Sequence, residues 1–181
     1  MKKYFLLLLF LLPLGLLAQS PAGLLDLRIG FGPTAFGSGE MKGFMIENEL
    51  TYTINAAYSA SFSLGVGYSD DGIDYSSSFL QSNLHAFYAP FGNDKRYIFR
   101  LGAGMTYLRY REIVQISPAS MDAVLLEPEY EFRNKLSPGM SILIDNTYHI
   151  NDKLLASTTL RMQHYTTDIS GSILVKIGIK I

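Results

Sequence analysis

Apolar and polar residues alternate one by one along many stretches of this chain. The clearest stretch is the last, where Ile173, Val175, Ile177, Ile179 and Ile181 occupy every second position. Side chains two residues apart point to the same face of a strand, whereas a helix would scatter these branched residues around its circumference. The pattern therefore predicts a β-strand over residues 172–181, with one apolar face.

Seven more segments repeat this alternation, and the expected strands are 25–32, 44–54, 58–68, 80–88, 97–107, 136–148, 154–163 and 172–181. The connections between them alternate in length. Short ones lie at 55–57, 90–96 and 150–153, longer ones at 33–43, 69–77 and 111–130, and a modest one at 166–170. Short turns at one end and long loops at the other are typical of an outer-membrane barrel. We therefore expect an all-β fold, an eight-stranded antiparallel up-and-down transmembrane β-barrel.

Alternation alone also permits a soluble, lipocalin-like carrier with an apolar interior. The polar face, however, is built from Gly, Ser and Thr with a few charges of both signs, which suits a narrow lumen better than a solvated exterior. The apolar face carries tyrosines at the strand ends, where their amphipathic rings suit the lipid headgroups. These expected girdle residues are Tyr52, Tyr58, Tyr88, Tyr97 and Tyr148 beside the short turns, and Tyr68 and Tyr107 at the long-loop ends. The membrane barrel is the favoured interpretation.

The first residues form a separate module. Lys2 and Lys3 precede an apolar stretch over residues 4–17, which is too short for a comfortable membrane-spanning helix and contains Pro13. We interpret residues 1–18 as a signal peptide cleaved after Ala18, and residues 19–181 as the barrel. The chain is then exported, and any membrane insertion uses strands.

Composition narrows the function classes. The chain has 181 residues, 48% of them hydrophobic and 17% charged, with a net charge of -1 and no cysteine. This fits one domain without an electrostatic footprint for nucleic acid. Disulfides, thiolate zinc sites and cysteine nucleophiles are excluded, and no cofactor is expected.

The signal peptide, the eight strands with glycine-rich inward faces and the final strand, residues 171–181, together resemble the small outer membrane protein β-barrel domain family, which includes OmpX-like and PorT-like barrels. The resemblance covers nearly the whole mature chain. It implies location in the outer membrane of a Gram-negative bacterium, handling by the barrel-insertion machinery and no shared enzymatic activity. Family members usually end in an aromatic residue that this machinery reads, whereas this chain ends in Ile181.

Eight strands enclose a space that side chains just fill, so no open pore is expected. The charged residues on the inward face are Asp26, Arg28, Glu47, Glu49, Arg100, Asp145, Arg161, Lys176 and Lys180. Arg28 is expected across from Glu47 or Glu49, and Lys180 near Asp26 at the periplasmic rim. A pairing network that holds the barrel closed is favoured over a selective ion path.

Catalytic and metal motifs are scarce. His85, His149 and His164 lie on three different strands, without metal-ligand spacing. Only His164, outward and near a long-loop end, could act as a base on outer-leaflet lipid, and no serine follows it as in the lipid A deacylase barrels. The acidic residues of loop 69–75 do not have the spacing of a calcium loop, and we expect a solvated loop near lipopolysaccharide.

The longest connection, residues 111–130, has a regular residue pattern at both of its ends. We expect the fifth and sixth strands to continue past the bilayer as a protruding hairpin, whose free edges offer a template for a partner's strand. Its apolar residues are Ile113, Val114, Ile116, Val124, Leu125 and Leu126. The alternative is a loop that folds over the barrel mouth as a cap. Pro138, which cannot donate to a closed ladder, suggests a bulge in the sixth strand.

Two function classes remain open. The favoured one is a structural or interaction barrel that acts through its extracellular loops, on outer-membrane lipid, lipopolysaccharide or an extracellular protein partner. The alternative is a narrow channel for ions or small solutes. A lipid-modifying enzyme is a lesser alternative.

Overall fold

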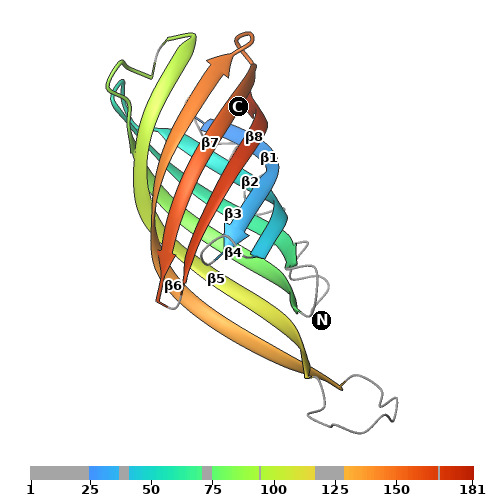
Figure 1. Cartoon of the computed structure of the whole chain (residues 1–181). Helices are drawn as coiled ribbons and strands as arrows, with labels where there is room; N and C mark the ends of the chain where they lie inside the picture. Colours follow the sequence, from blue (N-terminus) through green and yellow to red (C-terminus); the bar gives the residue numbers. More distant parts are fainter. Residues whose placement is uncertain (1–24, 37–40, 71–74, 94, 117–128, 167) are drawn as a thin grey trace, which may run out of the picture.

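The computed structural model describes residues 25–36, 41–70, 75–93, 95–116, 129–166 and 168–181, so the expected signal peptide, residues 1–18, lies outside the described residues. The elements are β1 (Leu25–Phe36), β2 (Met41–Thr53), β3 (Tyr58–Asp70), β4 (Tyr75–Tyr88), β5 (Tyr97–Ile116), β6 (Glu129–His149), β7 (Leu154–Tyr165) and β8 (Ile169–Lys180). Each strand pairs antiparallel with the next, and β1 pairs with β8. The expected closed eight-stranded barrel is confirmed (Figure 1).

The two faces of each strand differ as the alternation predicts. In β8, Ile173, Val175 and Ile177 are about half exposed on the outside, whereas Leu174 and Lys176 are fully buried in the lumen. The same contrast holds around the barrel, so the outer wall is apolar and the polar side chains are inside. An exposed apolar wall of this extent requires lipid rather than water around it. No helix in the described part of the chain is long and apolar enough to cross a membrane.

The strands extend further toward the long loops than the sequence predicts. β1 continues to Phe36 and β2 begins at Met41, while β3 reaches Asp70 and β4 begins at Tyr75. In β2 and β4 the extensions carry the outward polar residues Lys42 and Ser78, so the apolar alternation fades there although the backbone ladder continues.

β5 and β6 extend furthest, and their ladder runs to Ile116↔Glu129. β4 accompanies β5 as far as Val114, but β7 pairs with β6 only from Gly139 onward. Figure 1 shows the two strands projecting together beyond the rest of the barrel. The expected continuation of these strands is therefore present, and β6 has a free edge over residues 129–137 among the described strands.

The bulge expected at Pro138 is absent, because the register of β6 with β5 is unbroken from Tyr97↔Tyr148 to Ile116↔Glu129. The N–H and C=O of one strand residue point to the same neighbouring strand. The Pro138 carbonyl accepts from the Thr166 backbone N–H at 3.3 Å, so the missing N–H faces the side where the β7 ladder has ended. Proline is harmless there without any bulge.

A second proline, Pro33, lies within β1 rather than in the expected loop. The pairing of β1 with β8 stops at Phe31↔Val175 and resumes at Thr34↔Ser172. The Thr34 hydroxyl donates to the Gly171 carbonyl at 3.2 Å, which adds a bond across this seam.

Candidate functional site

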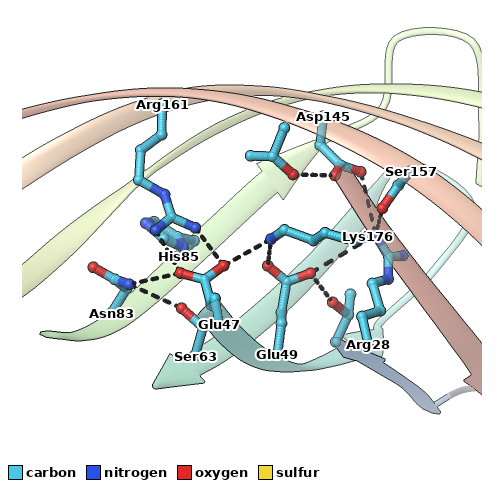
Figure 2. Close-up of polar contacts among 12 residues, drawn as sticks. Arg28, Glu47, Glu49, Ser63, Asn83, His85, Asp145, Ser157, Arg161 and Lys176 are labelled. Carbon is cyan, nitrogen blue, oxygen red and sulfur yellow. Dashed lines mark hydrogen bonds and ion pairs between the residues drawn. The ribbon is translucent and has the colours of Figure 1, made fainter. Parts of the chain in front are cut away.

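The lumen contains a continuous chain of alternating charges. In order, these are Arg161, Glu47, Lys176, Glu49, Arg28, Asp145 and Arg100, and Asp26 joins at Arg28. We call these eight residues the lumen network; Figure 2 shows most of it bridging the barrel interior. Its four carboxylates balance its four cations, and they are the buried Asp, Glu, Lys and Arg residues of the described chain. A neutral, fully paired set is the form in which charges tolerate burial.

Glu47, from β2, is the most heavily bonded member. Arg161 of β7 donates to both of its carboxylate oxygens, at 2.5 and 2.7 Å. Lys176 of β8 donates 2.8 Å to Glu47 and 2.7 Å to Glu49, so one ammonium bridges two carboxylates. Two-oxygen pairing with arginine is the strongest form of such contact. These bonds connect β2 to β7 and β8 across the lumen rather than along the sheet.

Arg28, from β1, joins the second half of the lumen network. It donates 2.9 Å to Asp26 and lies 3.7 Å from Glu49, its in-register neighbour on β2. It also reaches Asp145 at 3.4 Å, and Arg100 donates to the same carboxylate. Thr147 and Thr159 donate to Asp145 as well, at 2.8 and 2.9 Å. The carboxylate lone pairs are thus well satisfied, as burial requires.

Above the charges, toward the long loops, lies a layer of amides and hydroxyls. Asn83 donates to Ser63 at 2.9 Å and to Glu47 at 3.3 Å, which links this layer to the lumen network. Its carbonyl oxygen accepts from Gln81, Thr106 and Gln163. This layer continues the polar filling of the lumen without adding charge.

The layer of the lumen beyond the amides, toward the long loops, is apolar. On five strands a polar side chain is followed, two residues nearer the long loops, by a buried large one: Glu47 by Met45, Gln81 by Phe79, Thr106 by Leu108, Gln163 by Tyr165 and Lys176 by Leu174. These five large residues and Phe36 form one cluster, which we call the apolar seal. Because its members are at most 6% exposed, water has little access to the lumen network from this side.

Two glycines explain how long charged side chains fit in so narrow a lumen. Gly30 is paired with Lys176, and a Cβ at Gly30 would lie 2.6 Å from the lysine Cγ. Gly178 is paired with Arg28 in the same way, and a Cβ there would lie 2.7 Å from the arginine Cγ. Each glycine therefore provides the volume that the facing cation occupies.

Eight of the nine charged lumen residues expected from sequence come together in the lumen network. Lys180 does not. It is the last residue of β8 and lies half-buried at the short-turn end of the barrel. It is opposite Asp26 but makes no ion pair with a described residue. Asp26 pairs with Arg28 instead. The inward charges of the sequence do not indicate the amide layer or the apolar seal, which contain no charged side chain. The signal for the amide layer is the inward position of Gln81, Asn83 and Gln163, and the signal for the apolar seal is the inward position of Met45 and Leu174.

The seven expected girdle tyrosines all lie on the outer wall, with exposed fractions between 43 and 57%. Tyr58 and Tyr88 are in register, their rings 5.6 Å apart. Tyr97 donates to Asn146 at 2.8 Å, and Arg96 lies over the Tyr148 ring. Of the expected hairpin residues, Ile113, Val114 and Ile116 belong to the paired part of β5, whereas Val124, Leu125 and Leu126 lie outside the described residues.

No catalytic or metal constellation accompanies these features in the described chain. His164 lies on the outer wall between Met140 and Ile169, and no described side chain hydrogen-bonds to it. His85 is in the lumen, where its Nε2 lies 2.8 Å from the Ser141 hydroxyl. No group of three or more His, Asp or Glu side chains among the described residues could hold a metal ion.

No family model matches the chain, and no curated protein matches it. Several solved structures do. Neisserial surface protein A superposes with a TM-score of 0.62 at 16% identity, over 90% of this chain and 100% of that one. The N-terminal β-barrel domain of OprF from Pseudomonas aeruginosa gives a TM-score of 0.59 at 12% identity, over 89% of this chain and 100% of that domain.

Ail, the attachment invasion locus protein of Yersinia pestis, in complex with the heparin analogue sucrose octasulfate, gives a TM-score of 0.59 at 7% identity, over 87% of this chain and 97% of that one. At these identities the likeness is one of fold. The resemblance to small outer-membrane barrels is confirmed at that level, and the apolar outer wall agrees with it. The chain has the eight-stranded fold of small outer-membrane barrels.

Proposed function

We propose that this protein is a closed, non-conducting outer-membrane barrel with a structural or interaction role that it performs through its extracellular loops. The observation that carries the proposal is the filled lumen. Glu47, Arg161 and Lys176 are 0% exposed, and the apolar seal lies between them and the long-loop end. With its interior occupied by side chains that pair with one another, the barrel has its outer surface and loops left for function.

This filling also argues against the alternative of a narrow ion channel. A selective path needs polar groups that exchange water or ions, whereas the groups here are bonded to one another. The lumen network has no net charge, so it offers no uncompensated field to attract an ion of either sign.

Planar-bilayer recording tests the closed lumen. We expect no stable unitary conductance from the folded protein, while a porin of about 16 strands conducts in the same bilayer. Reproducible conductance steps from the folded protein would make the channel the better assignment.

The free edge of β6 supports a role in binding. Residues 129–137 pair with β5 on one side and with no described strand on the other. Such an edge presents backbone donors and acceptors in the spacing that an added strand requires. We propose that the β5–β6 hairpin receives an extended segment of an extracellular protein.

Site-specific photo-crosslinking in intact cells tests this role. A photoreactive residue at Asn134, exposed beside the edge, should crosslink to a discrete protein, whereas one at Asn151, in the exposed turn before β7, should not give that product. Replacing residues 115–127 by a short turn should remove the product and leave the barrel folded. If the shortened barrel keeps it, the hairpin is only a cap over the mouth.

We further propose that the protein is not an enzyme and that residues 1–18 are removed on export. The isolation of His164 from any described hydrogen-bonding side chain supports the first proposal. Unchanged lipid A after expression of the protein would agree with it. A mass of the mature chain beginning at Gln19 would agree with the second.

A further inference from the structure

The outer wall carries a cation at Arg109. Arg109 of β5 is exposed on the outside, in line with Tyr107 and Met105. Its in-register neighbours are Leu80 on β4 and Leu136 on β6, both about half exposed. No described residue forms a hydrogen bond or ion pair with Arg109. An arginine without a partner among the described residues, between two outward leucines, is suited to pair with an anion from its surroundings.

The height of Arg109 identifies these surroundings. Tyr97 and Tyr107 mark the two ends of the apolar band on β5, and ten residues of a strand tilted by about 45° rise about 25 Å. This matches the apolar height of an outer-membrane barrel. Arg109 is one outward step beyond Tyr107, and Arg111 is exposed one step further. Both cations therefore lie at the level of the outer-leaflet headgroups.

A furrow in the wall leads down from Arg109. Its upper part has a volume of about 610 Å³ and is lined by Leu80, Ser82, Tyr107, Arg109, Asn134 and Leu136, among others. A second hollow of about 530 Å³ shares Ser82 and Tyr107 and continues to Leu84, Met105 and Met140. We call the two together the Arg109 furrow. The furrow is present because Ser82, a small residue, lies on the outer wall between its larger in-register neighbours Leu64 and Tyr107.

We propose that the Arg109 furrow binds one lipid molecule of the outer leaflet whose headgroup carries a phosphate, the class to which the lipid A anchor of lipopolysaccharide belongs. Arg109 donates to the phosphate, and an acyl chain occupies the furrow below, against Leu84, Met105 and Met140. Asn134 lines the head end and is exposed, so it provides an amide for the polar part of the lipid.

The combination of features favours a lipid over a free anion. The head end alone would attract any phosphate, but the furrow continues as an apolar hollow into the level of the membrane core. Only a ligand with an anionic head and an apolar tail complements both parts. Lipid binding does not require a strand to be added at the β6 edge, although Asn134 and Leu136 line the furrow and also belong to that edge segment.

Binding of lipid A to the folded protein in dodecyl maltoside micelles, followed by native mass spectrometry and thermal stabilisation, tests the proposal. The parent should bind lipid A and bind its dephosphorylated form at least about tenfold more weakly, since a charge-assisted contact is lost. Arg109→Gln should weaken binding of lipid A by about tenfold. Ser82→Phe, which fills the furrow with an apolar group suited to the lipid face, should weaken it while leaving the headgroup contact available.

Lys42→Gln is the matched control. Lys42 is also exposed on the outer wall, one outward step beyond Phe44 of β2, but it lines neither part of the furrow. Binding should stay within about twofold of the parent, and each variant is first shown to fold by its gel mobility. The proposal is overturned if Arg109→Gln or Ser82→Phe binds like the parent, if Lys42→Gln weakens binding equally, or if inorganic phosphate displaces the lipid.

Discussion

Glu47 is the residue on which the lumen network depends most, because it compensates both Arg161 and Lys176. Glu47→Gln leaves these two buried cations with one carboxylate fewer, and breaking a buried pair in this way costs about 3 to 5 kcal/mol. We expect the free energy of unfolding in urea, measured in phosphatidylcholine vesicles, to fall by that order.

Ser61→Ala is the control for Glu47→Gln. Ser61 is buried in the same lumen, but its hydroxyl has no hydrogen-bond partner in the described structure. Its removal should change the free energy of unfolding by much less. Equal losses from the two variants would mean that the ion pairs contribute no more than ordinary lumen packing.

Gly30 provides a test of steric fit. A Cβ at Gly30 would lie 2.6 Å from Cγ of Lys176, whose ammonium is held by Glu47 and Glu49 and cannot move freely. Gly30→Ala should therefore destabilise the barrel by about 1 to 3 kcal/mol in the same unfolding assay. At Gly171, the nearest heavy atom to an added Cβ is 3.9 Å away. Gly171→Ala should be nearly neutral, and a cost as large as that of Gly30→Ala would show that lumen crowding is not the cause.

At this scale, sequence predicts which residues face the lumen but not which of them meet. Parity along each strand was enough to point Glu47, Arg161 and Lys176 inward. The pairing of Arg28 with Glu49 follows from the register of one hairpin. The pairing of Arg161 with Glu47 joins β7 to β2 across the lumen, and it depends on strand tilt and closure, which no local pattern contains.

At the scale of the strand, the two faces of β8 should respond oppositely to charge. Ile177 is 56% exposed on the lipid-facing wall, and Ile177→Arg places a cation near mid-membrane at a cost of about 2 to 4 kcal/mol. Ser172, inward on the same strand, has a hydroxyl without a partner in the described structure, so Ser172→Ala should be tolerated. The measurement is the folded fraction after insertion into vesicles. Comparable losses from both variants would contradict the assignment of faces.

Lumen positions are not uniformly tolerant, however. Lys176, adjacent to Ile177, bridges Glu47 and Glu49, and its removal leaves two buried carboxylates close together. The sequence places Lys176 on the inward face but does not indicate that it bridges two carboxylates.

The strands themselves were predictable where the apolar wall crosses the membrane. Other ends were not predictable: β4 begins at Tyr75 instead of Leu80, because outward Ser78 breaks the apolar alternation while the ladders with β3 and β5 continue. Backbone pairing does not need apolar side chains, so a strand can continue outside the bilayer after its hydrophobic alternation has ended. Pro33 and Pro138 mislead for a related reason, since proline is tolerated wherever its missing N–H faces an interrupted ladder.

At the scale of the whole molecule, the barrel is organised in levels rather than strand by strand. Charges, amides and the apolar seal follow one another toward the long loops, and each level contains residues from at least four strands. On the outside, the girdle tyrosines, the Arg109 furrow and the β5–β6 hairpin follow in the same direction. The levels inside the barrel close the lumen. On the outer surface, the tyrosines and the furrow face lipid, and the hairpin faces the extracellular space.

Closure of the sheet leads to the last prediction. Because β1 pairs with β8 from Asp26↔Lys180 to Phe36↔Ser170, the barrel has no open edge within the membrane, and its backbone groups are bonded internally. Detergent at room temperature should not unfold such a sheet. We expect residues 19–181 to migrate differently on SDS gels before and after boiling, as a compact closed barrel and as an unfolded chain respectively.

Ile29→Pro is the variant that targets closure. Ile29 lies between Asn48 of β2 and Ile177 of β8, in the middle of both ladders of β1. A proline there removes a backbone hydrogen bond inside a continuous ladder, where no gap in the pairing makes the loss harmless. The unboiled sample of this variant should run with the unfolded chain. Pro33→Ala, at the seam position where pairing is already interrupted, should keep the mobility of the parent. Identical mobility of the parent before and after boiling would count against closure itself.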